Sequence, residues 1–139
     1  MQAFGHHNVS VLNGGLPKWV KEGRPTESGE AKVSAVKYSV PTLNKQLVRD
    51  YAQVLENARQ GGKLAQVLDA RPNARFTGEA PEPRPGLSSG HMPGSISVPF
   101  NVVIQVGELL DSEKLREVFL SRGVDLDKEI VASCGKLIF

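Results

Sequence analysis

From residue 41 onward, the chain changes repeatedly between short apolar runs and segments with helical spacing. Residues 64–69, 95–98 and 130–133 are short and largely apolar, which is typical of buried strands in a parallel sheet. Residues 50–60 and 111–121 instead place their apolar side chains on one face of a helix. Because strands and helices alternate, the pattern predicts an α/β fold, in which helices flank both faces of a parallel sheet.

Capping residues give the bounds of the two helices. Asp50 is the expected N-cap of the first helix, and Gly61 follows its last turn. Asp111 or Ser112 caps the second helix, which ends before Gly123. The side chains expected to face the sheet are Tyr51, Val54, Leu55 and Ala58 on the first helix and Leu115, Val118 and Phe119 on the second.

The N-terminal part of the chain follows a different pattern. Residues 9–12 form an apolar run that predicts a strand, and residues 16–21 predict a short helix that Gly23 ends. One strand and one helix cannot bury a core of their own, so residues 1–23 are expected to be the C-terminal end of a domain. Residues 24–40 are mostly polar and predict an exposed linker.

Composition and charge disfavour several classes of function. The formal net charge is +2 and the 17 lysine and arginine residues are scattered, so nucleic acid is not an expected partner. No run approaches the roughly 18 apolar residues of a membrane span, and no membrane partner is expected. The chain has 1 cysteine and therefore no internal disulfide, which fits a reducing compartment. The 3 histidines, His6, His7 and His91, lack the spacing of metal ligands.

The cysteine is the strongest candidate for chemistry. Cys134 directly follows the last predicted strand, and open α/β sheets bind ligands at the carboxyl ends of their strands. Gly135 would let the backbone curl closely around the sulfur, where N–H groups favour a reactive thiolate. A free cysteine is also among the residue types most often buried. A nucleophile and an inert core residue both remain open from the spacing alone.

The long loop at residues 70–94 carries the other candidates. Its prolines stiffen the backbone, and a stiff loop can hold a guanidinium in place for a carboxylate or a sulfur oxyanion. Arg75 and Arg84 are the candidates, with solvated surface arginines as the alternative. His91 is expected to hydrogen-bond within the loop, and Asp69 to pair with a neighbouring arginine or to cap the turn that follows it.

Several blocks of sequence, in the same order, resemble two-domain sulfurtransferases of the rhodanese and 3-mercaptopyruvate sulfurtransferase group. The resemblance runs nearly from end to end of the chain. The blocks are Phe4-Gly5-His6-His7, Val9-Ser10-Val11-Leu12-Asn13-Gly14-Gly15-Leu16-Pro17-Lys18-Trp19, Leu68-Asp69-Ala70-Arg71, Arg75-Phe76-Thr77-Gly78-Glu79-Ala80-Pro81-Glu82-Pro83-Arg84, Gly90-His91-Met92-Pro93-Gly94-Ser95 and Val131-Ala132-Ser133-Cys134-Gly135.

The resemblance implies a domain organisation. Residues 41–139 are expected to be the second, catalytic rhodanese domain, with a parallel sheet flanked by helices and incomplete just after the active-site cysteine. Residues 24–40 would be the interdomain linker, and residues 1–23 a strand–helix remnant of the first rhodanese domain. In this interpretation the chain is a fragment truncated at both ends.

The resemblance also implies an activity. Cys134 matches the cysteine that takes sulfane sulfur as a persulfide and passes it to a thiol or cyanide. Arg75 and Arg84 match arginines that bind the anionic donor, 3-mercaptopyruvate or thiosulfate. The expected acceptor is thioredoxin or a small thiol, no cofactor is implied, and the expected location is cytoplasmic or mitochondrial. Gly135 favours the mercaptopyruvate branch, and the residues expected to support the site are Gly135, Asp69 and His91.

One departure from the family pattern affects this prediction. The family's active loop continues from Cys-Gly through Ser/Thr-Gly-Val-Thr into a helix, whereas Lys136-Leu137-Ile138-Phe139 follow Gly135 here. Activity is therefore expected to be impaired, and a catalytically inactive truncated isoform or a binding-only rhodanese module is the alternative. A cysteine phosphatase is disfavoured, because no arginine follows Cys134 at the Cys-x5-Arg spacing.

Overall fold

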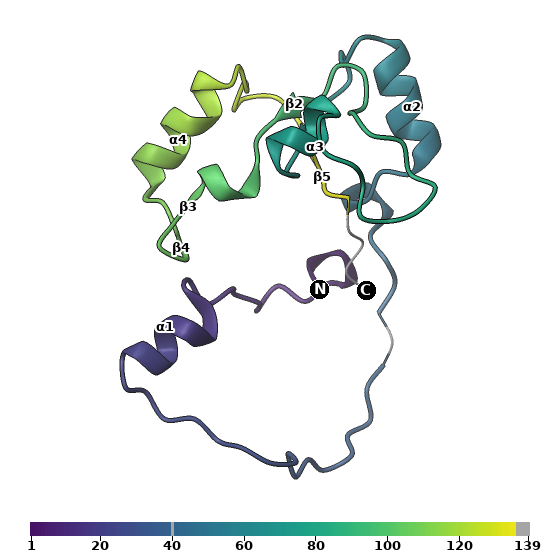
Figure 1. Cartoon of the computed structure of the whole chain (residues 1–139). Helices are drawn as coiled ribbons and strands as arrows, with labels where there is room; N and C mark the ends of the chain where they lie inside the picture. Colours follow the sequence, from purple (N-terminus) through teal and green to yellow (C-terminus); the bar gives the residue numbers. More distant parts are fainter. Residues whose placement is uncertain (40, 136–139) are drawn as a thin grey trace. The chain divides into compact units, whose positions relative to one another are not determined.

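The computed structural model describes residues 1–39 and 41–135. Val40, at the end of the predicted linker, and residues 136–139, which depart from the family's active loop, lie outside the described residues. The chain separates into two compact units, Met1–Arg49 and Asp50–Phe139 (Figure 1). The domain bounds inferred from the sequence stay a prediction.

The first unit contains little regular structure. Its elements are the 3₁₀ turn η1 (Gln2–Phe4), the helix α1 (Gly15–Lys21) and the 3₁₀ turn η2 (Lys45–Leu47). Helix α1 agrees with the helix predicted at residues 16–21. Gly23 follows the end of α1 with a φ of 68°, a left-handed conformation that stops helices.

The strand predicted at residues 9–12 is wrong. These residues have no regular secondary structure, and Val11 and Leu12 are 91% and 58% exposed. A strand needs a hydrogen-bonded neighbour, and the part of this unit that the structure describes contains no strand to pair with. The apolar pattern alone therefore does not produce the element.

A parallel sheet forms the centre of the second unit. Its strands β1 (Gln66–Asp69), β2 (Ile96–Ser97) and β5 (Ile130–Ser133) lie in the order β2-β1-β5. Both pairings of the central strand β1 are parallel. The α/β fold with a parallel sheet is thus confirmed, and all three strands lie within the segments predicted for them.

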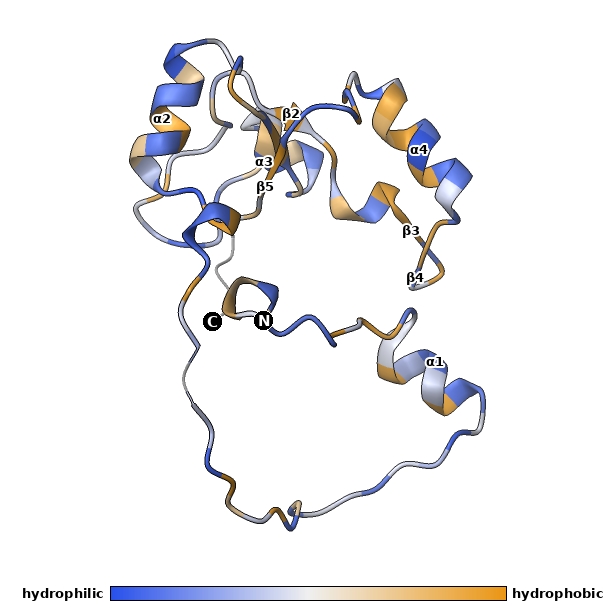
Figure 2. Ribbon diagram, turned by 180° about the vertical axis from the view of Figure 1, so that it is seen from behind, coloured by the Kyte–Doolittle hydropathy of each residue, from blue (hydrophilic) through white to orange (hydrophobic). Residues whose placement is uncertain are grey.

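Two amphipathic helices flank this sheet. They are α2 (Tyr51–Arg59) and α4 (Ser112–Ser121), which lie on opposite sides of it (Figure 1) and each carry hydrophobic and hydrophilic faces (Figure 2). Asp50 closes a capping box on α2, and Asp111 caps α4 by accepting a hydrogen bond from the backbone N–H of Lys114. Asp111, rather than Ser112, is therefore the N-cap of α4.

The core of the second unit lies on both faces of β1. Val67 and Leu68 follow each other along the strand and are both buried, so both faces of the sheet are covered. Leu68 packs with Val98 and Val124, and Phe119 of α4 lies against this cluster. On α2, Tyr51 is wrong as a member of the inner face. It is 81% exposed because the whole first turn of α2 lies in solvent, and the half-buried face begins at Val54.

A β-hairpin that the sequence pattern did not predict follows the 3₁₀ turn η3 (Phe100–Val102). Its strands β3 (Ile104–Gln105) and β4 (Glu108–Leu109) pair antiparallel across a two-residue turn. Both turn residues have a positive φ, 53° at Val106 and 82° at Gly107. Such turns favour Asn-Gly or Asp-Gly, so the β-branched Val106 is strained there. Because valine replaces the usual asparagine or aspartate, the sequence lacks the pattern that would predict a hairpin.

Asn57 connects α2 to the beginning of the central strand. It is 6% exposed, and its Nδ2 donates to the carbonyl of Ala65 at 2.9 Å. Its Oδ1 accepts from the backbone N–H groups of Leu64 and Ala65 at 3.0 and 3.1 Å. The side chain thus pairs the backbone groups that lead into β1 and helps to position Asp69 at the other end of the strand.

We expect Asn57→Ala to lower the free energy of unfolding of the second unit by about 2 kcal/mol, because buried backbone groups lose their partners. Urea denaturation measures this change. The matched control is Arg59→Ala, an exposed position on the same helix that should change stability by less than about 0.5 kcal/mol. Equal losses in the two variants would contradict the role given to Asn57.

We expect Val106→Asn to raise the free energy of unfolding by about 1 kcal/mol, because asparagine tolerates a positive φ. Thermal or urea denaturation measures the gain. Val106→Thr keeps the branched side chain while adding a polar group, so it should give no gain. A similar gain from threonine would mean that polarity, rather than backbone strain, limits stability at this turn.

Candidate functional site

The carboxyl ends of the three parallel strands meet at one edge of the sheet. Asp69 at the end of β1 is in register with Ser97 of β2 and Ser133 of β5. The backbone N–H of Ala70 donates to the carbonyl of Ser133 at 2.9 Å, which extends this pairing by one residue. Cys134 comes next in the chain, and its side chain is exposed. The thiol therefore lies at the edge of the sheet that the sequence predicted, and the alternative that Cys134 is a buried core residue is wrong.

Asp69 forms an ion pair with Arg71. The carboxylate is 1% exposed and accepts from Arg71 Nε at 2.9 and 3.0 Å and from Nη2 at 2.6 Å. It also accepts from the backbone N–H of Arg71 at 3.0 Å, which caps the turn after β1. Both structural roles predicted for this carboxylate are confirmed. The pKa of Arg71 is raised, chiefly by its hydrogen bond to Asp69.

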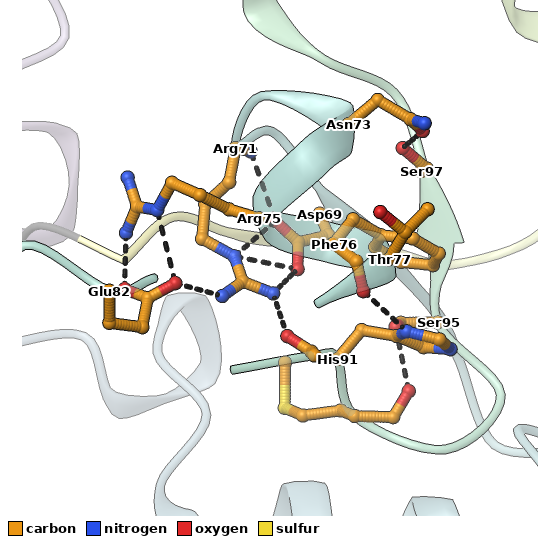
Figure 3. Close-up of polar contacts among 12 residues, drawn as sticks. Asp69, Arg71, Asn73, Arg75, Phe76, Thr77, Glu82, His91, Ser95 and Ser97 are labelled. Carbon is orange, nitrogen blue, oxygen red and sulfur yellow. Dashed lines mark hydrogen bonds and ion pairs between the residues drawn. The ribbon is translucent and has the colours of Figure 1, made fainter. Parts of the chain in front are cut away.

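Glu82 joins two arginines (Figure 3). One carboxylate oxygen accepts from Arg71 Nη1 at 2.9 Å and from Arg75 Nε at 3.0 Å, and the other accepts from Arg75 Nη2 at 2.5 Å. The side chain of Glu82 is only 3% exposed. Hydrogen bonding to Arg75 is the main cause that lowers the pKa of Glu82, so the carboxylate stays ionised.

Asp69, Arg71, Glu82 and Arg75 thus form a continuous series of alternating charges, which we call the charge series. It joins the end of β1 to the helix α3 (Asn73–Thr77), which carries Arg75, and to the loop that carries Glu82. The pKa of Arg75 is raised, mainly by its hydrogen bond to Glu82.

Two further contacts hold the loop after α3 in place. Arg71 Nη2 donates to the carbonyl of Gly90 at 2.7 Å. The ring of His91 stacks on Phe76 with centroids 3.8 Å apart, and its Nδ1 lies 2.8 Å from the carbonyl oxygen of Phe76. This confirms the prediction that His91 hydrogen-bonds the loop. Both ends of the segment that carries Glu82 are therefore fixed to the residues around β1 and α3.

Gly135 lies directly against the two arginines. A Cβ at this position would lie 2.5 Å from Arg75 Nη2 and 2.9 Å from Arg71 Cδ, which is far inside van der Waals contact. Any larger residue after Cys134 would have to displace these side chains or move the backbone. The contact brings the guanidinium of Arg75 to the loop that begins at the thiol.

The two predicted arginines differ in their surroundings. Arg75 is half-buried in the charge series, whereas Arg84 is exposed on the loop, and among residues 1–39 and 41–135 it makes no hydrogen bond or ion pair. Arg71 and Glu82 are not among the site residues predicted from the sequence. Glu82 could have been identified from its position between Pro81 and Pro83, because two prolines stiffen the backbone around a single acidic residue.

No group of three or more His, Cys, Asp or Glu side chains within residues 1–39 and 41–135 is arranged to hold a metal ion. In the same residues, no helix has the length and apolar character that a membrane span requires.

Comparisons with known proteins give one consistent group of relatives. The chain is 42% identical over 137 residues to a thiosulfate sulfurtransferase of Rattus norvegicus, covering 97% of this chain and 45% of that protein. It is 37% identical over 135 residues to a 3-mercaptopyruvate sulfurtransferase of Homo sapiens, covering 96% of this chain and 44% of that protein. The chain thus spans less than half the length of these curated relatives. No protein-family model matches it.

The fold comparison agrees with the sequence comparison. The crystal structure of SseA from Escherichia coli, described as the rhodanese fold of 3-mercaptopyruvate sulfotransferases, superimposes with a TM-score of 0.81 at 34% identity. The match covers 96% of this chain and 48% of that one.

We expect Gly135→Ala to lower the free energy of unfolding by about 2 kcal/mol, because the new methyl group must displace Arg75 from Glu82 or move the backbone. Urea denaturation measures the change. In an Arg75→Ala background, the same substitution should cost clearly less, because one of the two clashes is gone. An equal loss in both backgrounds would show that Arg75 does not lie against Gly135.

Proposed function

Because the chain belongs to the rhodanese and 3-mercaptopyruvate family of sulfurtransferases, we propose that it moves sulfane sulfur from an anionic donor to a thiol or cyanide through a persulfide on Cys134. The rate would be impaired, because Lys136-Leu137-Ile138-Phe139 replace the family's active loop after Gly135. The donor would be 3-mercaptopyruvate first and thiosulfate second. The observation that carries the proposal is the position of Arg75. It lies against the glycine that follows an exposed thiol at the carboxyl edge of the sheet.

Cys134 is the proposed nucleophile. Its thiolate attacks the sulfur of 3-mercaptopyruvate and a sulfur–sulfur bond forms. The carbon–sulfur bond breaks, and its electron pair stays on carbon, so that pyruvate leaves as its enolate and then takes up a proton. In the second half of the cycle an acceptor thiolate attacks the outer sulfur and releases the Cys134 thiolate.

Arg75 and Arg84 are proposed to bind the donor. A guanidinium recognises a carboxylate or a sulfur oxyanion by paired hydrogen bonds, and the Nη2 of Arg75 lies beside the loop that carries the thiol. Glu82 uses Nε and one hydrogen of Nη2, so the other edge of the guanidinium, Nη1 and the second hydrogen of Nη2, is the edge we assign to the donor. Arg84, on the exposed loop, would complete the binding of the same anion.

The acceptor and the location follow from the same proposal. The exposed position of Cys134 gives a second thiol access to the outer sulfur, which supports a small thiol or a protein such as thioredoxin as the acceptor. A cytoplasmic or mitochondrial location is compatible with a chain whose cysteine is free. One structure of similar fold is a sulfur transferase subunit of yeast mitochondrial complex I.

The test is intact mass spectrometry after addition of 3-mercaptopyruvate or thiosulfate. We expect the mass of one sulfur on the protein and none on Cys134→Ser. Arg75→Ala should slow persulfide formation from 3-mercaptopyruvate by about 10- to 100-fold, because a hydrogen bond to a charged group contributes about 1.5–3 kcal/mol.

Arg116→Ala is the matched control for this experiment. Arg116 is an exposed arginine on α4, and its removal changes the net charge as Arg75→Ala does. It should leave the rate of persulfide formation unchanged. Sulfur added equally to Cys134→Ser would refute the proposed function. No sulfur added from either donor would refute it in favour of the alternative, a catalytically inactive chain or a binding-only rhodanese module.

A further inference from the structure

Glu82 has no part in the proposed sulfur transfer, yet it is one of the least exposed charged side chains of the second unit. Its side chain is 3% exposed, compared with 20% for Arg75 and 11% for Arg71. A carboxylate that loses this much water is stable only when charged groups satisfy both of its oxygens. Arg71 and Arg75 satisfy both oxygens of Glu82, and Glu82 in turn restrains the side chain of Arg75.

The hydrogen bonds of Glu82 fix the orientation of the Arg75 guanidinium. Two of them, from Nε at 3.0 Å and from Nη2 at 2.5 Å, hold one edge of the planar group side-on. The third, from Arg71 at 2.9 Å, prevents the carboxylate from turning. Because Arg71 is itself held by Asp69 and by the carbonyl of Gly90, the carboxylate is anchored to the sheet rather than to a free loop.

We infer that Glu82 is a positioning residue, which holds the Arg75 guanidinium over the backbone of Gly135 so that its remaining edge faces an anion brought to Cys134. The inference rests on the proposed function only in that Arg75 binds an anion there. The placement of the guanidinium itself comes from the contacts of Glu82 and Gly135.

Charge and geometry make opposite predictions for the removal of Glu82. If the carboxylate acted only through its negative charge, its loss would make the site more positive and would strengthen the attraction of an anion. If it acts by positioning, its loss frees Arg75 to leave the loop, and the attraction weakens although a negative charge has been removed. The sign of the change therefore distinguishes the two roles.

Alkylation of Cys134 measures this sign without any sulfur transfer. Iodoacetate carries a carboxylate and iodoacetamide is its neutral counterpart, and both react as the thiolate sulfur displaces iodide. Differences in the exposure and ionisation of the thiol affect both rate constants equally and cancel in their ratio. The ratio therefore measures how strongly the surroundings of Cys134 favour a negatively charged reagent over a neutral one. The chain has 1 cysteine, so every alkylation reports on Cys134.

Relative to the unsubstituted protein, we expect Glu82→Gln to lower the ratio of the iodoacetate and iodoacetamide rate constants by about threefold or more. The ratio should approach the one measured for Arg75→Ala. Glu79→Gln is the matched control. It removes the same charge from an exposed position three residues earlier in the same loop and should leave the ratio unchanged. In an Arg75→Ala background, Glu82→Gln should have no further effect. A ratio that rises or stays constant in Glu82→Gln would overturn the inference.

A second variant covers the case in which Glu82→Gln does not fold. Glu82→Asp keeps the charge but shortens the side chain by one methylene, so it cannot reach both arginines in the same geometry. We expect a lower ratio in Glu82→Asp as well, and a ratio equal to that of the unsubstituted protein would overturn the inference.

Parallel measurement of persulfide formation separates this inference from the proposed function. If the alkylation ratio changes as expected while neither donor adds sulfur, Glu82 positions Arg75 and the proposed donors are wrong. If sulfur is transferred, Glu82→Gln should raise the KM for 3-mercaptopyruvate more than it lowers kcat. If sulfur is transferred while the alkylation ratio does not change in Glu82→Gln, the proposed function stands and Glu82 has no positioning role.

Discussion

The second unit depends on one electrostatic constraint. Each charged side chain in the charge series can be removed from water only if an oppositely charged neighbour compensates for the lost hydration. Asp69 is 1% exposed at the end of the central strand, and an unpaired carboxylate there would be unstable. Arg71 satisfies Asp69 and then requires Glu82, which in turn requires Arg75. Each ion pair connects one element to the next: β1 to the turn after it, this turn to the loop that carries Glu82, and the loop to α3. These elements are thus joined by ion pairs rather than by a large apolar core.

This arrangement connects the fold to the proposed chemistry. The parallel register places Ser133 beside Asp69, and the chain then turns past the thiol to Gly135. Gly135 lies directly on the two arginines, so the loop that carries the proposed nucleophile and the charge series share one surface. The sheet therefore supplies two things at its carboxyl edge: an exposed sulfur and a guanidinium held in a defined orientation.

The sequence predicted the parts of this fold that depend on local patterns. Capping residues and helical periodicity located α2 and α4, and short apolar runs located β1, β2 and β5. The strand expected at residues 9–12 failed because strand formation needs a partner, and the pattern of one segment does not contain its neighbour. The hairpin of β3 and β4 was missed because Val106 occupies a turn position that normally holds asparagine or aspartate.

The candidate site was predictable in its types of residue but not in its connections. Cys134 and Arg75 stand out from their neighbours in the chain, and the structure places Arg75 against Gly135, next to the exposed thiol. Glu82 is separated from Arg71 and Arg75 by 11 and 7 residues. An irregular loop has no periodic sequence pattern from which such contacts could be predicted. The role of Glu82 is therefore visible only in the folded structure, where the loop lies against α3.

The charge series also has a bearing on how a small anion reaches the thiol. The charges of its two carboxylates and two guanidiniums cancel, and the whole chain carries a formal net charge of only +2. The proposed donor anion would therefore experience little long-range attraction, and ionic strength should have little influence on how often it reaches the thiol. Under the proposed function, discrimination among anions would rest on contact at short range, where the shape and spacing of the donor's oxygens matter more than its total charge.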